Sequence, residues 1–273
     1  EEMQLPTFET LDLRIDDRVA EVYLNRPDKA NAMNRPMWDE IQSCFEFLDT
    51  EPAVRAIILA GNGRNFCAGI DLEMLTGLFG EGMEAGRRRE ALRRHILRLQ
   101  GNLTAIEACR KPVLAAIHNS CVGGGIDLVT CCDMRYASED AWFSVREVDM
   151  GLAADVGTLQ RLPKLVPDGV AREMAYTARP VDAEEARAIG LVNRVYDSRE
   201  RMLQDVREIA GTIAAKSPLA VRSTKEVLLY TRDHSVAEGL NQVATWNAGM
   251  LSTGDLQEAM AAHLEKRSGS YED

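Results

Sequence analysis

The chain has 273 residues, of which 45% are hydrophobic and 27% charged, as in a globular protein with a substantial core. Its 32 Lys and Arg against 43 Asp and Glu give a formal net charge of −11, which argues against a nucleic-acid partner, because phosphate contacts need basic side chains. No apolar run reaches the ~18–20 residues of a membrane span. The densest basic cluster, Arg87-Arg88-Arg89 with Arg93 and Arg94, is interpreted as a solvated helix face.

Hydrophobic periodicity divides the first half of the chain into short strands and helices. Strands are predicted over 8–15, 19–24, 54–59, 112–117, 134–137 and 142–145. Helical spacing predicts a helix whose buried face carries Trp38, Ile41, Phe45 and Leu48, and a charged helix over 84–109. Strands that alternate with helices in this way predict an α/β core.

From about residue 199 to 266 the pattern changes to one helix after another, and Pro218 is expected in the first turn of one of them. We therefore divide the chain into an α/β core that holds the active site, residues 1–198, and a helical C-terminal region, residues 199–273. A helical tail of this kind packs on its own core or on a neighbouring subunit.

The six cysteines lack the spacing of a zinc site and have apolar neighbours, which favours reduced, buried thiols. The four histidines are scattered, so no metal site is expected. The sequence starts at Glu1 instead of Met, which leaves room for a removed targeting segment, and it ends at Asp273 without a Ser-Lys-Leu type signal. We expect a cytoplasmic protein in a bacterium, or a mitochondrial matrix or peroxisomal protein in a eukaryote.

The most informative stretch is the turn Gly123-Gly124-Gly125, which leads into the apolar run Ile126-Asp127-Leu128-Val129. Glycines leave backbone N–H groups open to a ligand, and the helix expected to begin here adds unpaired donors and the positive end of its dipole. Two further acids, Glu147 and Asp155, follow within a short distance along the chain. Fixed donors for an oxyanion together with acids that move protons suit enolate chemistry.

Two segments resemble the oxyanion-hole segments of the crotonase (enoyl-CoA hydratase/isomerase) superfamily. They are Asn65 to Leu72, which contains Ala68-Gly69-Ile70-Asp71-Leu72, and His118 to Leu128. The resemblance implies a crotonase-like spiral of ββα units with a helical C-terminal trimerisation region. It also implies that the backbone N–H groups of Ile70 and Gly124 hold the thioester oxygen of a coenzyme A substrate, with Ala68, Gly69, Asp71 and Leu72 beside it.

An earlier segment, Asn25-Arg26-Pro27 followed by Ala30-Asn31-Ala32-Met33, resembles the family's loop that lines the coenzyme A site. It places Ala30 and Lys29 among the substrate-binding residues. Lys29 would meet a phosphate of coenzyme A or, as an exposed loop lysine, only solvent. Asp71 has a structural interpretation as well, which it shares with Asp149.

The acids distinguish the branches of the family. Hydratases of this superfamily carry Glu at the positions of Asp127 and Glu147, and commonly Gly at that of Asp155. The runs Glu147 to Pro163 and Arg232 to Val236 resemble instead the Δ3,5-Δ2,4-dienoyl-CoA isomerases. In those enzymes the acid matching Asp155 lies near C2 of the acyl group and the one matching Glu147 lies near C6.

The resemblance therefore implies an isomerase that converts 3,5-dienoyl-CoA to 2,4-dienoyl-CoA in the β-oxidation of unsaturated fatty acids. Glu147, Asp155 and Asp127 are its candidate catalytic acids. No separate cofactor is expected, because coenzyme A is part of the substrate. The resemblance also implies a homotrimer or a homohexamer.

Other interpretations stay open at this point. An enoyl-CoA hydratase or monoenoyl-CoA isomerase on the same fold would not need Asp155. An aryl-CoA dehalogenase would typically carry Trp at position 147. An RNA-binding relative would fit the acidic composition poorly. The glycines could form only a tight turn, Glu147 could lie at the surface and pair with Arg146, and Asp155 could be a helix N-cap. Asp127 could be structural or could support catalysis.

Overall fold

The computed structural model describes residues 4–76, 78 and 82–273. A six-stranded sheet forms its centre, in the order β1-β2-β3-β4-β6-β9, and all neighbouring strands are parallel except β1 and β2. Its strands are β1 (Leu11–Asp16), β2 (Val19–Leu24), β3 (Ala56–Gly61), β4 (Val113–Ile117), β6 (Met134–Ser138) and β9 (Arg194–Tyr196). A smaller sheet consists of β5 (Ser120–Val122), β7 (Trp142–Ser144) and β8 (Val181–Asp182).

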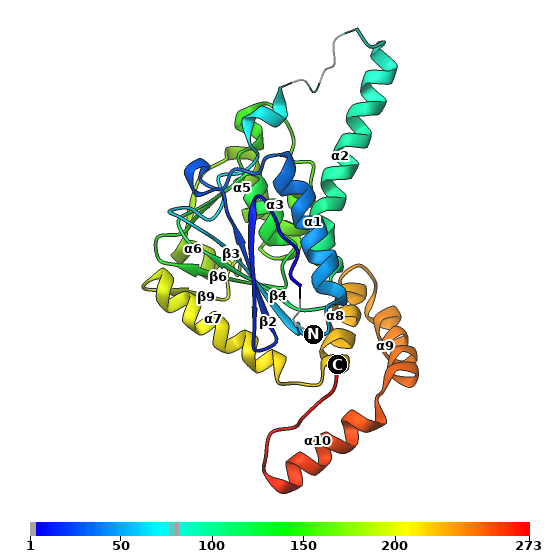
Figure 1. Cartoon of the computed structure of the whole chain (residues 1–273). Coiled ribbons are helices and arrows are strands. Elements are labelled where there is room, and N and C mark those ends of the chain that lie inside the picture. The colour runs from blue at the N-terminus through cyan, green and yellow to red at the C-terminus, as the bar shows by residue number, and fades with distance from the viewer. Residues whose placement is uncertain (1–3, 77, 79–81) are drawn as a thin grey trace.

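Helices surround these sheets (Figure 1). Those before residue 199 are α1 (Arg35–Thr50), α2 (Ala85–Ala108), α3 (Gly124–Thr130), α4 (Thr158–Arg161), α5 (Asp168–Thr177) and α6 (Ala183–Ala188), with short 3₁₀ turns η1 (Pro27–Lys29), η2 (Leu72–Leu75), η3 (Glu147–Met150) and η4 (Leu162–Lys164). The later ones are α7 (Arg199–Ala214), α8 (Pro218–Arg232), α9 (Val236–Met250) and α10 (Thr253–Glu265). None of the described helices is long and apolar enough to cross a membrane.

The large sheet is buried on both faces, as its continuous apolar strands β3 and β4 require. On one face the side chains of Met202, Val206 and Ala210 from α7 pack against Ile58 and Leu114. The other face belongs to the main core, which contains the apolar stripe of α1 predicted from the sequence. The site described below lies on the side of this main core, where β5 and α3 follow β4.

Most predicted elements are confirmed, with shifts of one to three residues at their ends; the strand expected at 8–15 runs over Leu11–Asp16. The strand expected at 54–59 runs over Ala56–Gly61, and the charged helix expected at 84–109 runs over Ala85–Ala108. Pro218 is the first residue of α8, as expected. The strands β5, β8 and β9 were not predicted, because two or three residues seldom show a clear period; among the strands this short only β7, expected at 142–145, was predicted.

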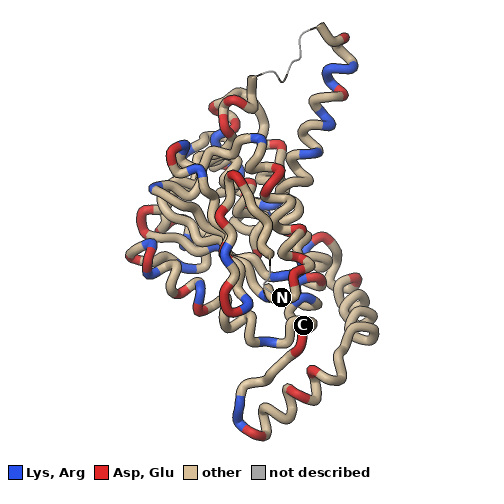
Figure 2. The backbone as a smooth tube through the Cα atoms, in the orientation of Figure 1, with Lys and Arg blue, Asp and Glu red and all other residues tan. Residues whose placement is uncertain are grey.

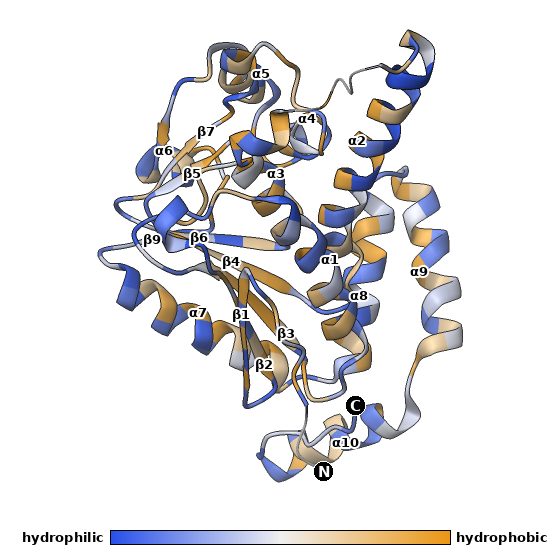
Figure 3. Cartoon of the chain, turned by 45° about the horizontal axis from the view of Figure 1, so that its top comes forward, coloured by the Kyte–Doolittle hydropathy of each residue, from blue (hydrophilic) through white to orange (hydrophobic). Residues whose placement is uncertain are grey.

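The last three helices, α8 to α10, extend along the side and lower end of the molecule as an arm (Figure 1). Figure 3 shows hydrophobic residues spread along α8 and α9. Large apolar side chains are exposed on this arm: Leu228, Val236, Leu240, Met250, Leu251, Leu256, Met260 and Leu264. A helical arm with so many exposed apolar residues has a surface suited to a partner.

Candidate active site

Two chain segments that are far apart in sequence lie side by side at the site. The Cys67 N–H donates to Ser120 O at 2.9 Å and the Val122 N–H donates to Cys67 O at 3.1 Å, which joins the Ala68-Gly69-Ile70 loop to β5. On its other side, the Met33 N–H donates to Gly69 O at 2.7 Å. The structure therefore brings together the two motifs and the early loop segment that the sequence singled out.

The backbone amides of Ile70 and Gly124 are close to one another and free. A Cβ added to Gly124 would lie 3.4 Å from the Ile70 nitrogen and 2.6 Å from Met33 Cε. Within the described part of the chain, neither amide donates a hydrogen bond to another protein atom. Gly69, at φ +102°, lies in a region that favours glycine, and a Cβ there would lie 2.9 Å from Val122 O. Two unpaired donors that converge in this way can hold an oxyanion.

Asp127, on α3, is fully buried and is held by Thr158 at the start of α4. Its Oδ1 accepts hydrogen bonds from the Thr158 N–H at 2.8 Å and from the Thr158 hydroxyl at 2.7 Å. Its Oδ2 is buried and has no partner among the described residues. Burial, followed by the charge of Glu147, raises the pKa of Asp127 to about 7, against the opposing effect of the Thr158 hydrogen bonds.

Glu147, the first residue of η3, is the neighbour of Asp127. Its Oε2 is also buried and unpaired among the described residues. Burial raises the pKa of Glu147 and the charge of Asp155 adds to this, while the backbone N–H of Glu147 and the neighbouring Asp127 carboxyl oppose it. Two carboxylates cannot donate to each other, so the two orphan oxygens become satisfied when one proton is held between Asp127 and Glu147.

Asp155 lies half-buried in the segment between η3 and α4, and its charge acts on Glu147. Burial raises its pKa, and His95 on α2 opposes this shift. Its backbone oxygen accepts a hydrogen bond from Gln100 Nε2 at 2.7 Å. Gly157, not Asp155, precedes α4 as its N-cap, and α4 has no side-chain cap. The N-cap interpretation of Asp155 is therefore wrong.

Two other interpretations can be checked directly. Arg146 lies 3.9 Å from Asp149 and donates to Ser144, and it forms no ion pair with Glu147. The turn at Gly123 has φ +53°, which glycine tolerates. This turn leaves the backbone N–H of Gly124 without an acceptor among the described residues, so it offers a donor as well as a connection between β5 and α3. The structure places Glu147 against Asp127, away from the surface pairing that the sequence left open.

The early loop is held by polar contacts. Asp71 accepts a hydrogen bond from Arg26 Nη1 at 2.9 Å and caps η2 through the Glu73 N–H, and both contacts lower its pKa, the Glu73 bond more than the Arg26 bond. Ala30 O accepts from the Ala68 N–H at 3.0 Å. Lys29 and Leu72 are exposed beside this loop, and Asp71 thus has the structural role foreseen for it.

Sequence reasoning did not single out Thr158 or Gln100, each of which contacts a site residue, and it named Met33 only as the last residue of the early loop segment. Thr158 lies inside the run Glu147 to Pro163, so the signal was present, but nothing in a one-dimensional pattern links it to Asp127. The contact depends on α4 folding back over α3.

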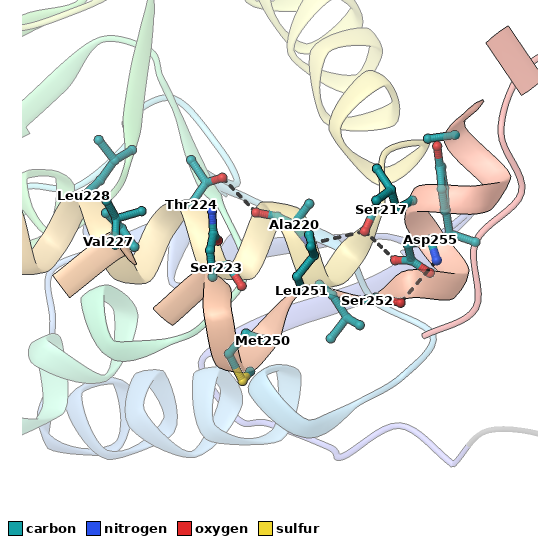
Figure 4. Close-up of a pocket in the computed structure, with 16 residues that line it drawn as sticks. Ser217, Ala220, Ser223, Thr224, Val227, Leu228, Met250, Leu251, Ser252 and Asp255 are labelled. Carbon is teal, nitrogen blue, oxygen red and sulfur yellow. Dashed lines mark hydrogen bonds between the residues drawn. The ribbon is translucent and has the colours of Figure 1, made fainter. Parts of the chain in front are cut away.

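No three His, Cys, Asp or Glu side chains come together as a metal site anywhere in residues 4–76, 78 and 82–273. All six cysteines are free and buried. A separate cavity of about 480 Å³ lies between α8 and the α9–α10 segment (Figure 4). Its wall contains Val227, Leu228, Met250 and Leu251 and none of the three carboxylates, so it belongs to the C-terminal arm.

Comparisons of the sequence and of the structure with known proteins find relatives over nearly the whole chain. A family model described as enoyl-CoA hydratase/isomerase matches residues 14–273. An Arabidopsis thaliana protein named Delta(3,5)-Delta(2,4)-dienoyl-CoA isomerase, peroxisomal, is 46% identical over 98% of this chain and 99% of its own. The Homo sapiens protein with the same name, mitochondrial, is 49% identical over 91% of this chain and 77% of its own. A solved enoyl-CoA hydratase from Bacillus anthracis superposes with a TM-score of 0.87 at 31% identity, covering 97% of this chain and 99% of its own.

Proposed function

The chain belongs to the enoyl-CoA hydratase/isomerase family, and from that premise we propose that it is a Δ3,5-Δ2,4-dienoyl-CoA isomerase of unsaturated fatty acid β-oxidation. The fold predicted from the motifs is confirmed by the superposition with a hydratase of this family. The observation that carries the proposal is the set of three carboxylates in which Glu147 interacts with both Asp127 and Asp155. The free amides of Ile70 and Gly124 complete the site. Proteins with this activity in their names share almost half of the sequence.

The reaction needs one proton removed and one added at opposite ends of a conjugated chain. The Ile70 and Gly124 amides hold the thioester oxygen as the enolate develops, without reorganising during the reaction. Asp155, ionised, takes the proton from C2. Glu147 delivers a proton to C6, and the double bonds move from the 3,5 to the 2,4 positions. The substrate loses one proton and gains one, so the product has the same atoms as the substrate.

Asp127 keeps the donor supplied with its proton. A buried carboxyl whose pKa is about 7 holds a proton near neutral pH, and its contact with Glu147 allows that proton to move to the residue that uses it. The shared proton also separates the roles of the acids, since Asp155 lies outside the pair and can remain ionised. After turnover Asp155 releases its proton to solvent and the pair takes one up.

We extend the proposal to the remaining features of the site and the chain. Ala68, Gly69, Asp71 and Leu72 line the thioester, and Ala30 and Lys29 lie toward coenzyme A. No cofactor besides the substrate's own coenzyme A takes part. The apolar arm of α8 to α10 assembles the chain into a homotrimer or a dimer of trimers. The compartment is the cytoplasm in a bacterium, and the mitochondrial matrix or peroxisome in a eukaryote.

Incubation with 3,5-dienoyl-CoA tests the function. The proposal expects the ultraviolet absorbance of the conjugated 2,4-dienoyl product to rise, with much slower hydration of 2-enoyl-CoA under the same conditions. Rapid hydration of 2-enoyl-CoA without dienoyl isomerisation would contradict it and assign a hydratase, the alternative that the Asp127–Glu147 pair alone would allow.

A further inference from the structure

The two segments that resemble dienoyl-CoA isomerases, one after Glu147 and one at Arg232, meet in space. They are joined by Glu107 near the end of α2. Glu107 Oε2 accepts from Arg161 Nε at 2.8 Å and from Arg232 Nη1 at 2.7 Å. Arg232 also binds Asp233 at 2.9 Å, and Asp233 binds Lys164 Nζ at 2.7 Å.

Four ion pairs join these five side chains into a chain of alternating charge, which we call the charge ring: Arg161, Glu107, Arg232, Asp233 and Lys164. Its two ends, Arg161 and Lys164, are three residues apart at the junction of α4 and η4, so both ends belong to the same short segment. Its centre is shielded from solvent, since the side chains of Arg161 and Glu107 are 13% and 15% exposed. Burial alone would raise the pKa of Glu107, but the hydrogen bonds from Arg232 and Arg161 hold it below its ordinary value, so the ring stays charged.

The ring reaches the active site through Arg161. Gly157 has φ +129°, and the Arg161 guanidinium occupies the place where its Cβ would be, so the two pack directly. The backbone N–H of Arg161 also donates to Gly157 O at 3.0 Å. Gly157 lies between Asp155 and Thr158, the residue that anchors Asp127. Arg161 thus fixes the turn that carries one candidate acid and holds another.

At its other end the ring reaches the C-terminal arm. Arg232 is the last residue of α8, and Asp233 caps that helix. Lys164 Nζ lies 3.4 Å from the Arg232 carbonyl oxygen as well. Figure 1 shows the end of α2 beside α8, where Glu107 joins both sides. The orientation of α8 and the geometry of the 155–158 turn are therefore set by the same ion pairs.

We propose that the charge ring is a positioning device, in which Arg161 and Arg232 hold the 155–158 turn in its catalytic geometry and make that geometry depend on the C-terminal arm. The inference rests on the proposed function, in which Asp155 and Asp127 act on the substrate's protons. It predicts that residues far from the substrate control the rate of the chemical step and not the binding of coenzyme A thioesters. Networks of this kind change coupling between sites by about 2- to 30-fold.

The test compares three variants that each remove one guanidinium: Arg161→Met, Arg232→Met and Arg222→Met. Arg222 is the matched control, because it lies on α8 as well and pairs with Asp273 at 2.7 Å with 15% side-chain exposure, but it does not contact the ring. We expect kcat on 3,5-dienoyl-CoA to fall about 2- to 30-fold in the first two variants, with KM unchanged and the control unaffected.

Three further readouts separate positioning from loss of stability. Loosened Thr158 contacts raise the pKa of Asp127, so the alkaline limb of the kcat profile moves to higher pH in Arg161→Met and Arg232→Met. The double variant costs no more than the worse single one, because both act through Glu107. Arg161→Lys, which keeps the charge, recovers part of the rate.

A folded Arg232→Met enzyme with the wild-type kcat and pH profile overturns the proposal. So does an equal fall in kcat for the Arg222→Met control. Failure of the proposed function looks different, since wild type itself then leaves 3,5-dienoyl-CoA unchanged. In that case the same variants assayed for hydration of 2-enoyl-CoA still report whether the ring positions the turn.

Discussion

Asp127 and Thr158 are 31 positions apart in the chain, yet both donors of Thr158 point at the same carboxylate oxygen. One oxygen of Asp127 is thereby fixed, and only the other is left for Glu147. This relationship turns an aspartate inside an apolar core into a group with a defined proton partner.

Figure 2 shows how the charged residues are otherwise distributed along the chain, with basic residues following one another on the outer part of α2.

Thr158→Val keeps the shape of the side chain and the backbone N–H but removes the hydroxyl donor. Because that hydrogen bond favours ionised Asp127, its loss raises the pKa of the pair and moves the alkaline limb of the rate profile to higher pH. We expect kcat to fall roughly 10-fold, as for a hydrogen bond to a charged group. Thr158→Ser is the control and should restore both quantities. An unchanged pH profile in Thr158→Val contradicts the anchoring role.

Gly124→Val should lose about 10²–10³ in turnover, because a side chain would then occupy the space between the two free amides. Gly124 does not have a positive φ, so valine adds no backbone strain there, and the atom it meets first is the flexible end of Met33. Gly101→Val on α2, where a Cβ meets nothing within 4 Å, is the control. Full activity in a folded Gly124→Val enzyme removes Gly124 from the oxyanion hole.

The rate of isomerisation should depend on pH as a bell. On the alkaline side it falls as pH rises through about 7, where the Asp127–Glu147 pair loses its shared proton. On the acid side it falls as Asp155 becomes protonated, at a pH above the ordinary range of an aspartate, because burial raises its pKa. A kcat that stays constant from pH 6 to about 9 contradicts this assignment.

Stability should depend on pH through the same residue. The pKa of Asp127 is about 7 when folded against 3.8 for an ordinary aspartate. The native state therefore keeps a proton that the unfolded chain loses, so this contribution is complete below pH 3.8 and is lost as pH rises to about 7. Asp127→Asn should reduce the fall in melting temperature between these limits. The exposed Asp149→Asn is the control, and an equal change in both variants contradicts the prediction.

Light scattering at micromolar concentration should give a trimer or a hexamer. Met260→Lys with Leu264→Lys places two charges on the exposed apolar face of α10, where the side chains are 60% and 79% exposed, and should favour smaller species. Tyr176→Lys, on α5 and 69% exposed, is the matched control. A stable wild-type monomer contradicts the proposed assembly.

The sequence predicted the elements that have a period to detect. The apolar stripe of α1 and the buried strands β3 and β4 stand out because several residues repeat one pattern. The motifs around Gly69 and Gly124 predicted two free amides, because glycine leaves the backbone bare. The division of the chain at residue 199 stays a prediction; α7, just after it, packs on the sheet through Met202 and Val206.

The side chains that contact each acid could not be predicted from the sequence. Thr158, Gln100 and Glu107 are ordinary polar residues in one dimension, and their roles depend on how α2 and α4 pack together. The same holds for Asp155, which as an aspartate before a short helix had the pattern of an N-cap. The cap is Gly157 instead, and its positive φ gives the turn the shape that Arg161 fills.

We propose that Asp155 and Glu147 act at opposite ends of one proton transfer. Turnover of Asp155→Asn, Glu147→Gln and the double variant on two substrates decides whether they do. On 3,5-dienoyl-CoA each single variant should lose about 10²–10⁴ in rate, and the double variant should lose little more, because residues that act as a unit are not additive. On 2-enoyl-CoA any hydration should survive Asp155→Asn but not Glu147→Gln. An Asp155→Asn enzyme that isomerises 3,5-dienoyl-CoA at the wild-type rate would contradict the account.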